Sequence, residues 1–552
     1  MEMEAFHDLS EDERPSDDSV KDQETEKRGI ATESLLPGPP EDKLHRGLNG
    51  LHMQMIAFGG SIGTGLFVGS GHALATGGPL FLVLNFALVG IMLFTVVMAL
   101  GELATALPVS GSLASYSTRM IHPAWGFAMG WNYWMQWVVA LPFELTVSTI
   151  VIRYWDVDGK ITSGVWITIF LVLITIINFF GVKGYGNVEV AGSMFKIVAV
   201  LAFFIIAIVI DAGGAPSGQY FGAKTWSDPG PTNNGFKGFC SVFVTAAFGY
   251  AGTELVGLAA RESANPRKEI PKASKQVVYR IILFYCLSLF LVGLIVPYNN
   301  PHLAGAKNAS SSPFVIAMDL GGVKVMPHIF NAVILVSVLS VGNSASYGAS
   351  RTIAGMALAG QAPKIFGYID NRGRPVVALG LSLVIGCLAY LQYASGQDVI
   401  FSWLLALSGL SSIITWGSVC AAHIRFRLAF ERQGHSLDEL PWKSPLGIWG
   451  SVFGLVFNVV VLLLNFYISV APIHPAADAN GRAYDFFQSY LTVPVVIAFF
   501  VFAKLKWRVT MPALEDIDLD TGREIVPLDI LRAEREESNQ LPTINKLWNL
   551  LC

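Results

Sequence analysis

Four glycines interrupt an apolar stretch that is long enough to cross a lipid bilayer. The stretch at residues 52–71 reads HMQMIAFGGSIGTGLFVGSG, with Gly59, Gly60, Gly63 and Gly65 near its middle. Each glycine in a helix interior costs about 1 kcal/mol relative to alanine, and unwound backbone inside a membrane is tolerated only where it lines a cavity or is buried in protein. An interrupted span presents a half-helix N-terminus, whose free N–H groups and positive dipole suit a carboxylate. The pattern therefore predicts the substrate site of a transporter.

A second apolar segment is interrupted in the same way. It reads FCSVFVTAAFGYAGTELVGLAA at residues 239–260, and Gly249 and Gly252 are followed by Glu254. A carboxylate beside a cavity either exchanges protons or accepts hydrogen bonds from exposed backbone N–H groups, and the sequence leaves both readings open. Phe248 stands next to the interruption, where it either packs as aromatics usually do or closes over a substrate.

Three other ionisable residues fall inside apolar segments, where each costs several kcal/mol unless it is paired or wet. Lys196 lies nine residues into its helix, near the bilayer midplane, and either couples transport to a proton or ties two helices together. Glu144 is expected near the outer interface, where a wet vestibule alone explains it. Glu102 lies close to an inner helix end and is a further candidate.

One enzyme motif is present. The run from Gly59 to Gly63 matches G-x-S-x-G, but a nucleophile elbow needs a strand, a sharp turn and a helix, and this motif is flanked by apolar segments. No Walker A, H-E-x-x-H or paired-cysteine signature is visible, which argues against an ATP-driven pump. We expect no enzyme activity, no metal, no cofactor and no nucleic-acid partner.

The composition places the chain in a lipid bilayer. Of 552 residues, 53% are hydrophobic and 14% are charged, whereas soluble domains carry about 25% charged residues. An acidic tail, disordered by its composition, is expected over 1–45, a transmembrane domain over 46–506 and a second tail over 507–552. Twelve spans are expected near 52–75, 79–107, 125–152, 164–182, 188–211, 238–260, 279–299, 326–349, 375–394, 398–422, 447–470 and 486–505.

Twelve spans place both tails on the same side of the membrane. With the tails inside, most loop lysines and arginines, Arg280 among them, fall in inner loops, so the tails should face the cytosol. The sequon at Asn308 then lies in an outer loop, where glycosylation is possible. The first and sixth spans carry the interruptions, as expected of two five-helix halves in an inverted-repeat transporter followed by two added helices.

Several motifs resemble those of the fungal amino acid permeases of the amino acid–polyamine–organocation superfamily. They are GGSIGTGLFVGSG at 59–71, ALGELATALPVSGS at 99–112, FGYAGTELVGLAARES at 248–263, NPRKEIPKA at 265–273 and GRPVVA at 373–378. The resemblance implies an all-α membrane protein with a LeuT-like fold of five plus five inverted repeats and two additional C-terminal helices. It also implies a plasma-membrane importer that carries amino acids together with protons.

The resemblance assigns roles to individual residues. The substrate carboxylate would be bound by Ser61, Ile62, Gly63, Thr64 and Gly65, and the α-amino group by the carbonyls of Phe248, Gly249 and Ala251, with the Phe248 ring closing over the ligand. Thr253 is a further candidate for substrate binding. Lys196 resembles a lysine that takes the place of a sodium ion in proton-coupled relatives, with Glu254 as the second titratable group. Cys552 is similar in position to a palmitoylated terminal cysteine, and the tails are candidates for ubiquitin-dependent regulation.

Two alternatives stay open. A polyamine or other cationic-amine transporter would have the same fold, but its pocket would want acidic or aromatic residues, whereas the glycine-rich first span favours a carboxylate. A non-transporting amino acid sensor would signal through its tails, which are short in this chain.

Overall fold

The computed structural model describes residues 48–60, 62–109, 112–156, 158–303, 312–395 and 397–540. Ser61, Asn308, Cys552 and the expected N-terminal tail lie outside these residues, so the expectations for them stay predictions. Within the described residues the fold is helical, and the only β-type contact is an isolated bridge between Leu48 and Ser263.

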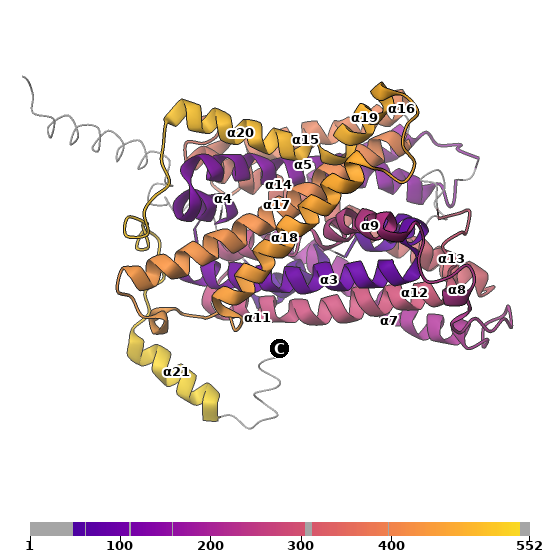
Figure 1. Ribbon diagram of the computed structural model, residues 1–552, viewed down its shortest axis with the longest axis horizontal. Coiled ribbons are helices and arrows are strands. Elements are labelled where there is room, and N and C mark those ends of the chain that lie inside the picture. Colours follow the sequence, from indigo (N-terminus) through magenta and orange to yellow (C-terminus); the bar gives the residue numbers. More distant parts are fainter. Residues whose placement is uncertain are drawn as a thin grey trace, which may run out of the picture.

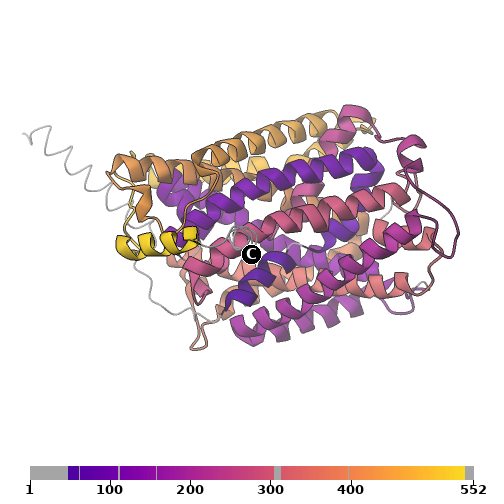
Figure 2. The ribbon, with the colours of Figure 1, turned by 90° about the horizontal axis from the view of Figure 1, so that it is seen from below.

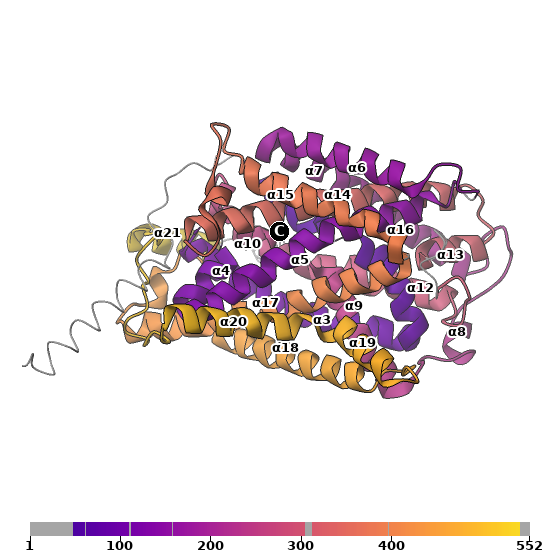
Figure 3. The ribbon, with the colours of Figure 1, turned by 90° about the horizontal axis from the view of Figure 1, so that it is seen from above.

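Most of the long helices run along the long axis of the molecule (Figure 1). Viewed from above, α6 and α7 lie along one side of the bundle, and α18 and α20 lie along the opposite side (Figure 3). The longer helices, in chain order, are α2 (Gly50–Gly59), α3 (Ser70–Ala106), α5 (Pro123–Ile152), α6 (Ser163–Phe179), α7 (Gly181–Asp211), α9 (Gly235–Tyr250), α11 (Pro266–Tyr279), α12 (Ser288–Ile295), α14 (Met326–Leu358), α15 (Val376–Gly386), α17 (Gln397–Arg432), α18 (Gly447–Val470), α19 (Ala479–Tyr490), α20 (Thr492–Trp507) and α21 (Leu528–Gln540).

The first two expected spans are joined without a loop. A π-helical turn, η1 (Gly65–Gly69), runs into α3, and the two spans are divided only at Gly78, where φ is +80° and Pro79 follows. A Cβ atom at Gly78 would lie 2.8 Å from the Cα atom of Thr232 and 2.9 Å from the amide nitrogen of Asn233. Only glycine fits this corner, because the backbone is both left-handed and in close contact with another segment.

Several helices extend beyond the apolar segments that predicted them. The expected span 279–299 begins at Pro266, as α11, a π-helical segment η4 (Arg280–Leu287) and α12. The expected span 326–349 continues to Leu358, and 398–422 continues to Arg432. Hydropathy marks only the apolar stretch of a helix, whereas these extensions pair their polar groups with other parts of the protein.

By length and apolarity, eight helices of the described chain can cross a membrane, or nine if α19 and α20, which meet at a 67° bend, form one span. Helix α6 and the segment Val376–Leu391 are apolar but shorter. Each of the twelve expected segments coincides with a helix or a chain of helices, but length and apolarity alone do not give twelve separate spans.

The segment that follows α20 is folded onto one end of the bundle. Arg119 donates a hydrogen bond to the Thr521 carbonyl (2.7 Å), and the Glu524 amide donates to the Ala106 carbonyl (2.9 Å). Ile517 and Leu519 are buried. Helix α21 lies across this end (Figure 2), where Glu534 pairs with Arg267 of α11. We call residues 508–527 the C-terminal strap.

Replacing Gly78 with alanine should lower the thermal stability of the purified protein. The new Cβ atom forces a left-handed residue against fixed backbone, so the cost should exceed about 1 kcal/mol. Gly380→Ala is the matched control, because Gly380 lies in α15 with open space around its Cα atom. Equal melting temperatures for the two variants in one detergent would contradict the role of Gly78.

Candidate functional site

The two interrupted spans meet at their breaks. Helix α2 ends at Gly59 and helical structure resumes at Thr64, while α9 ends at Tyr250 and the short helix α10 (Leu255–Ala259) follows. A Cβ atom on Gly65 would lie 2.3 Å from the Cα atom of Gly249. The two backbones therefore touch, and this approach depends on glycine at position 65. Both interruptions predicted from the sequence are present.

A small cavity lies beside this contact. From the two breaks it is lined by Gly63, Thr64, Gly65, Phe248 and Ala251, and from other helices by Gln136, Trp137, Ala140, Glu144, Val341 and Ser408. Its volume is about 20 Å³, which is room for one or two water molecules. Side chains must therefore move before a larger molecule enters.

Two polar atoms of residues at the cavity are buried and lack a hydrogen-bond partner among the described atoms. They are Oε1 of Gln136 and Oε1 of Glu144, both on α5. Buried polar groups normally have partners, so these atoms are ready to bind a polar ligand or water. Sequence reasoning missed Gln136 and Trp137. Both lie about two helical turns before Glu144, and this spacing indicates that they share a face of α5 with it.

Glu144 is not in the wet outer vestibule that the sequence predicts. Its side chain is 1% exposed and accepts a hydrogen bond from the Thr64 hydroxyl, at the break of the first span. The depth argument fails because α5 has 30 residues, about 45 Å of helix, and a helix longer than the hydrocarbon core tilts or protrudes. Residue number along such a helix is a poor measure of depth.

The cavity lies between helix ends of opposite polarity. The helix that starts at Thr64 and continues through η1 into α3 directs its N-terminus, with a positive dipole end, toward the cavity. Helix α9 ends beside the cavity at Tyr250, so its carbonyl end supplies the negative pole. A small zwitterion matches this arrangement in charge.

Not every residue assigned to substrate lines the cavity. Ile62 is buried in the core, and Gly249 instead accepts a hydrogen bond on its carbonyl from the Tyr285 hydroxyl (2.7 Å). Thr253 donates to the Tyr250 carbonyl (2.7 Å). Phe248 does line the cavity, and its ring contacts Phe143 edge to face at 5.0 Å.

Glu254 is fully buried and accepts three hydrogen bonds. The donors are Gln136 Nε2 at 3.1 Å, Trp416 Nε1 at 3.3 Å and the Gly252 amide at 3.2 Å. The bond from Gly252 pairs a backbone N–H group of the unwound segment. Accepting such a bond is one of the two roles that the sequence left open for Glu254, the other being proton exchange.

Lys196 is fully buried on α7 and holds the end of α2. Its Nζ atom donates to the Gly59 carbonyl (2.5 Å) and to the Ser340 hydroxyl of α14 (2.9 Å). It also lies 3.8 Å from Oε1 of Glu189. Sequence reasoning missed Glu189 because the expected helix begins at 188, which puts this carboxylate in its first turn. The helix α7 in fact begins at Gly181, so Glu189 lies well inside it.

Arg280 is a second buried cation at the same helix end. The sequence places it in an inner loop, but it belongs to η4 and is 1% exposed. Its guanidinium donates to the Ala57 carbonyl of α2 and to the Thr253 hydroxyl. Two cations from different helices thus neutralise the carbonyl end of α2, where the helix dipole is negative.

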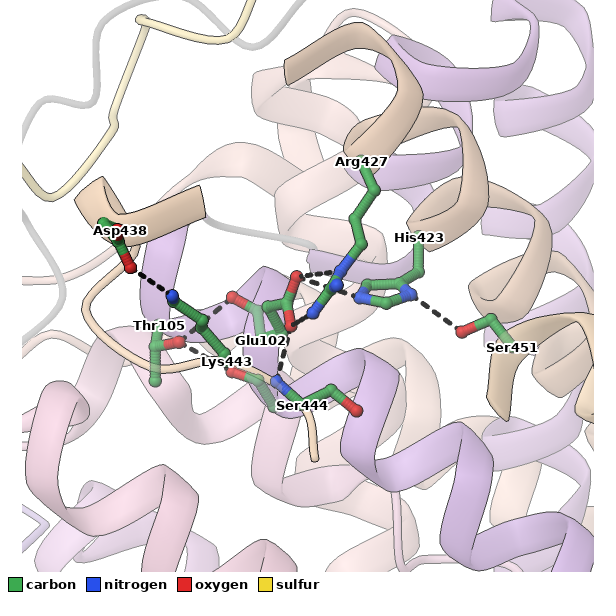
Figure 4. Close-up of polar contacts among 9 residues, drawn as sticks. Glu102, Thr105, His423, Arg427, Asp438, Lys443, Ser444 and Ser451 are labelled. Carbon is green, nitrogen blue, oxygen red and sulfur yellow. Dashed lines mark hydrogen bonds and ion pairs between the residues drawn. The ribbon is translucent and has the colours of Figure 1, made fainter. Parts of the chain in front are cut away.

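Glu102 lies apart from the cavity, in a buried junction of three segments (Figure 4). Its carboxylate pairs with Arg427 Nε (2.8 Å) and Nη2 (2.6 Å), and with His423 Nε2 (3.1 Å), both on α17. It also accepts the backbone N–H of Ser444 (2.5 Å), which precedes α18. The geometry fits a joint between α3, α17 and the loop before α18.

Comparison with known proteins places these features in a family. The sequence profile "Amino acid permease" matches residues 52–515. The general amino-acid permease GAP2 of Candida albicans is 51% identical over 92% of this chain and 87% of its own length. The general amino-acid permease GAP1 of Saccharomyces cerevisiae is 46% identical over 92% and 85%, and the cationic amino acid transporter 1 of Schizosaccharomyces pombe is 51% identical over 87% and 81%.

Glu102→Gln should destabilise the protein strongly, by about 3–5 kcal/mol, because it leaves the Arg427 guanidinium largely buried without a counter-charge. Glu515→Gln is the control, since it removes an exposed ion pair with Arg432, and pairs of this kind contribute about 0–1 kcal/mol. Thermal unfolding of both purified variants checks the difference. A Glu102→Gln variant with the same melting temperature as the wild type would show that the junction contributes little to the free energy of unfolding.

Proposed function

Because the chain belongs to the amino acid permease family, we propose that it imports amino acids across the plasma membrane together with protons. The substrate binds at the cavity between the two broken spans and is exposed alternately to each side of the membrane. The observation that carries this proposal is the cavity's position between a helix N-terminus and a helix carbonyl end.

The geometry supports recognition of a zwitterion. The substrate carboxylate binds at the amides of Gly63, Thr64 and Gly65, where the dipole of the helix that begins there favours a negative charge. The α-amino group binds toward the C-terminal end of α9, near Phe248 and Ala251. Phe248 closes over the ligand, and the unpaired polar atoms of α5 face the rest of it.

Lys196 is the proposed coupling group. It links α2 to α14 through Gly59 and Ser340, and its charge decides how strongly it holds the carbonyl end of α2. Loss of the proton weakens that attachment and frees the inner half of the first span to move. Glu254 and Glu144, both buried near the cavity, are further candidates for a proton.

The proposed architecture has twelve spans, with two inverted repeats of five and two added helices. It is supported by interruptions in the first and sixth expected spans, the corresponding members of the two halves. The tails are placed in the cytosol. Lys504 and Lys506 in the last turn of α20, next to the C-terminal strap, are consistent with the positive side of the protein. Ubiquitin-dependent regulation through the tails stays a prediction.

Uptake of each of the twenty amino acids by a permease-deficient yeast that expresses this chain tests the function. Saturable uptake that is stronger at acidic outside pH is expected, and a protonophore should abolish accumulation. Uptake of spermidine or choline without uptake of any amino acid would favour the cationic-amine alternative. Binding without uptake would favour the sensor.

Gly65→Ala should reduce uptake at least tenfold while the protein still reaches the membrane. The added methyl group would press against the backbone of Gly249, which cannot move aside without separating the two breaks. Gly69→Ala is the matched control, since its Cβ atom would lie 3.2 Å from the Thr245 methyl group and in ordinary contact, at 3.7 Å, with the Thr64 carbonyl oxygen. If Gly65→Ala takes up substrate at the same rate as the control, the contact between Gly65 and Gly249 is not needed for transport.

Lys196→Met should abolish accumulation driven by a proton gradient. Methionine keeps most of the side-chain volume but carries no proton and leaves the Gly59 carbonyl without its partner. The measurement is uptake into proteoliposomes with and without an inward proton gradient. Gradient-driven accumulation equal to that of the wild type would exclude Lys196 from coupling.

A further inference from the structure

A line of buried polar side chains leads away from Lys196 between α7 and α14. On α7 its members are Lys196, Glu189 and Tyr185, and on α14 they are Ser340, Ser344 and Tyr347. All six are buried. In each helix they recur after three, four or seven residues, so they lie on the facing sides of the two helices. Polar side chains inside a membrane protein cost free energy unless they are paired, and a row of them is a candidate pathway for an ion or proton.

The first links form a directed chain of hydrogen bonds. Lys196 Nζ donates to the Ser340 hydroxyl (2.9 Å), and this hydroxyl donates in turn to Oε1 of Glu189 (2.8 Å). The Ser344 hydroxyl bonds Oε2 of the same carboxylate (3.2 Å) and lies 3.1 Å from the Tyr185 hydroxyl. Four consecutive contacts therefore connect the lysine to Tyr185.

The chain reaches toward the end of the bundle that carries the C-terminal strap. Lys196 and Tyr185 are separated by about 16 Å of helix, roughly half of a 30 Å hydrocarbon core. Tyr185 stacks on Tyr347, with ring centroids 4.2 Å apart and planes at 5°. The Tyr347 hydroxyl donates to Glu262, which pairs with Arg351 at 3.3 Å.

We propose that Ser340, Glu189, Ser344 and Tyr185 form a relay that carries the coupled proton from Lys196 toward the cytosol. The inference rests on the proposed function, in which Lys196 holds that proton. It adds the route by which the proton leaves and identifies Glu189 as the first acceptor.

The first step conserves atoms and charge. The Lys196 ammonium gives a proton to Ser340 Oγ while Ser340 gives its own proton to Glu189 Oε1, so an ion pair becomes a neutral amine and a neutral carboxylic acid. The serine is unchanged after the step. The net charge of the buried pair is zero before and after, so no uncompensated charge is created in the low dielectric of the core.

The second step needs the Ser344 hydroxyl to turn. In the structure it donates to Glu189, so it must rotate to accept the proton from the acid and pass its own to the Tyr185 oxygen. The Tyr185 hydroxyl proton then passes to a water molecule that enters from the cytosolic side, so the tyrosine is unchanged after the step. The charged and titratable groups around the relay are Glu144, which faces Lys196 from α5, and Glu262 with Arg351 at its inner end. Glu262 marks the point where water must enter for the proton to leave.

The test separates proton movement from substrate movement in proteoliposomes that contain the full-length protein. The probe is radiolabelled L-alanine, or the amino acid best accumulated in the uptake panel. Exchange of labelled for unlabelled substrate without a gradient reports binding and alternation. Accumulation under an inward proton gradient, with a pH dye inside the vesicles, reports coupling.

Glu189→Gln and Ser340→Ala should lower gradient-driven accumulation and the dye signal at least tenfold, and Tyr185→Phe at least threefold, while exchange falls less than twofold. Ser193→Ala is the matched control. Ser193 is also a buried residue of α7, but its hydroxyl donates to the Met55 carbonyl (3.0 Å) and has no place in the chain. It should behave as the wild type in both measurements.

The outcomes distinguish the relay from the proposed function. Wild-type protein that does not respond to a proton gradient overturns the proposed coupling itself. If the wild type accumulates substrate under a proton gradient, and Glu189→Gln and Ser340→Ala do so equally well, the relay is overturned and the proposed function stands. Equal losses of exchange and accumulation in Glu189→Gln, together with full coupling in Tyr185→Phe and Ser340→Ala, assign Glu189 to a structural role and also overturn the relay.

Discussion

The carbonyl groups at the end of α2 set the central constraint on this protein. A helix that stops inside a membrane leaves its last carbonyls without helical partners, and no lipid atom can pair with them. Lys196 and Arg280 pair with the carbonyls of Gly59 and Ala57 from two different helices. Their charges also match the negative dipole end. The break can therefore persist without water, and α7 and η4 are fixed relative to it.

The same constraint explains why the neighbouring glycines are needed. A Cβ atom on Gly59 would lie 1.8 Å from Ser193 Oγ and 2.6 Å from Glu189 Oε1, and one on Gly65 would meet the backbone of Gly249. The helices approach closely because these positions lack side chains. Close approach brings Lys196 within reach of the Gly59 carbonyl and brings the two helix ends of opposite polarity to one cavity. The packing of the helices and the polarity of the cavity thus depend on the same residues.

The sequence predicts the interruptions well because several neighbouring glycines weaken a helix, and a membrane tolerates unwound backbone only at a cavity or inside protein. Helix ends and partners are harder to predict. Arg280 stands at the polar start of an apolar run, and hydropathy cannot distinguish a loop arginine from one that is buried against a broken helix. Glu189 escapes notice for the same reason, since it precedes the most apolar part of α7. Gln136 and Glu144 share a face of α5, but only the tertiary fold shows that this face meets the Thr64 break.

The C-terminal strap is held both by side chains, such as Arg523 paired with Glu439 and the buried Ile517 and Leu519, and through its main chain. Arg425 donates to the Pro512 carbonyl, Gln433 donates to the carbonyls of Leu514 and Ile517, and Arg119 donates to that of Thr521. In each of these main-chain contacts the body of the protein supplies the side chain and the strap supplies a group that every residue type possesses. The outward-facing positions of this segment can therefore change identity over evolutionary time without removing these backbone contacts.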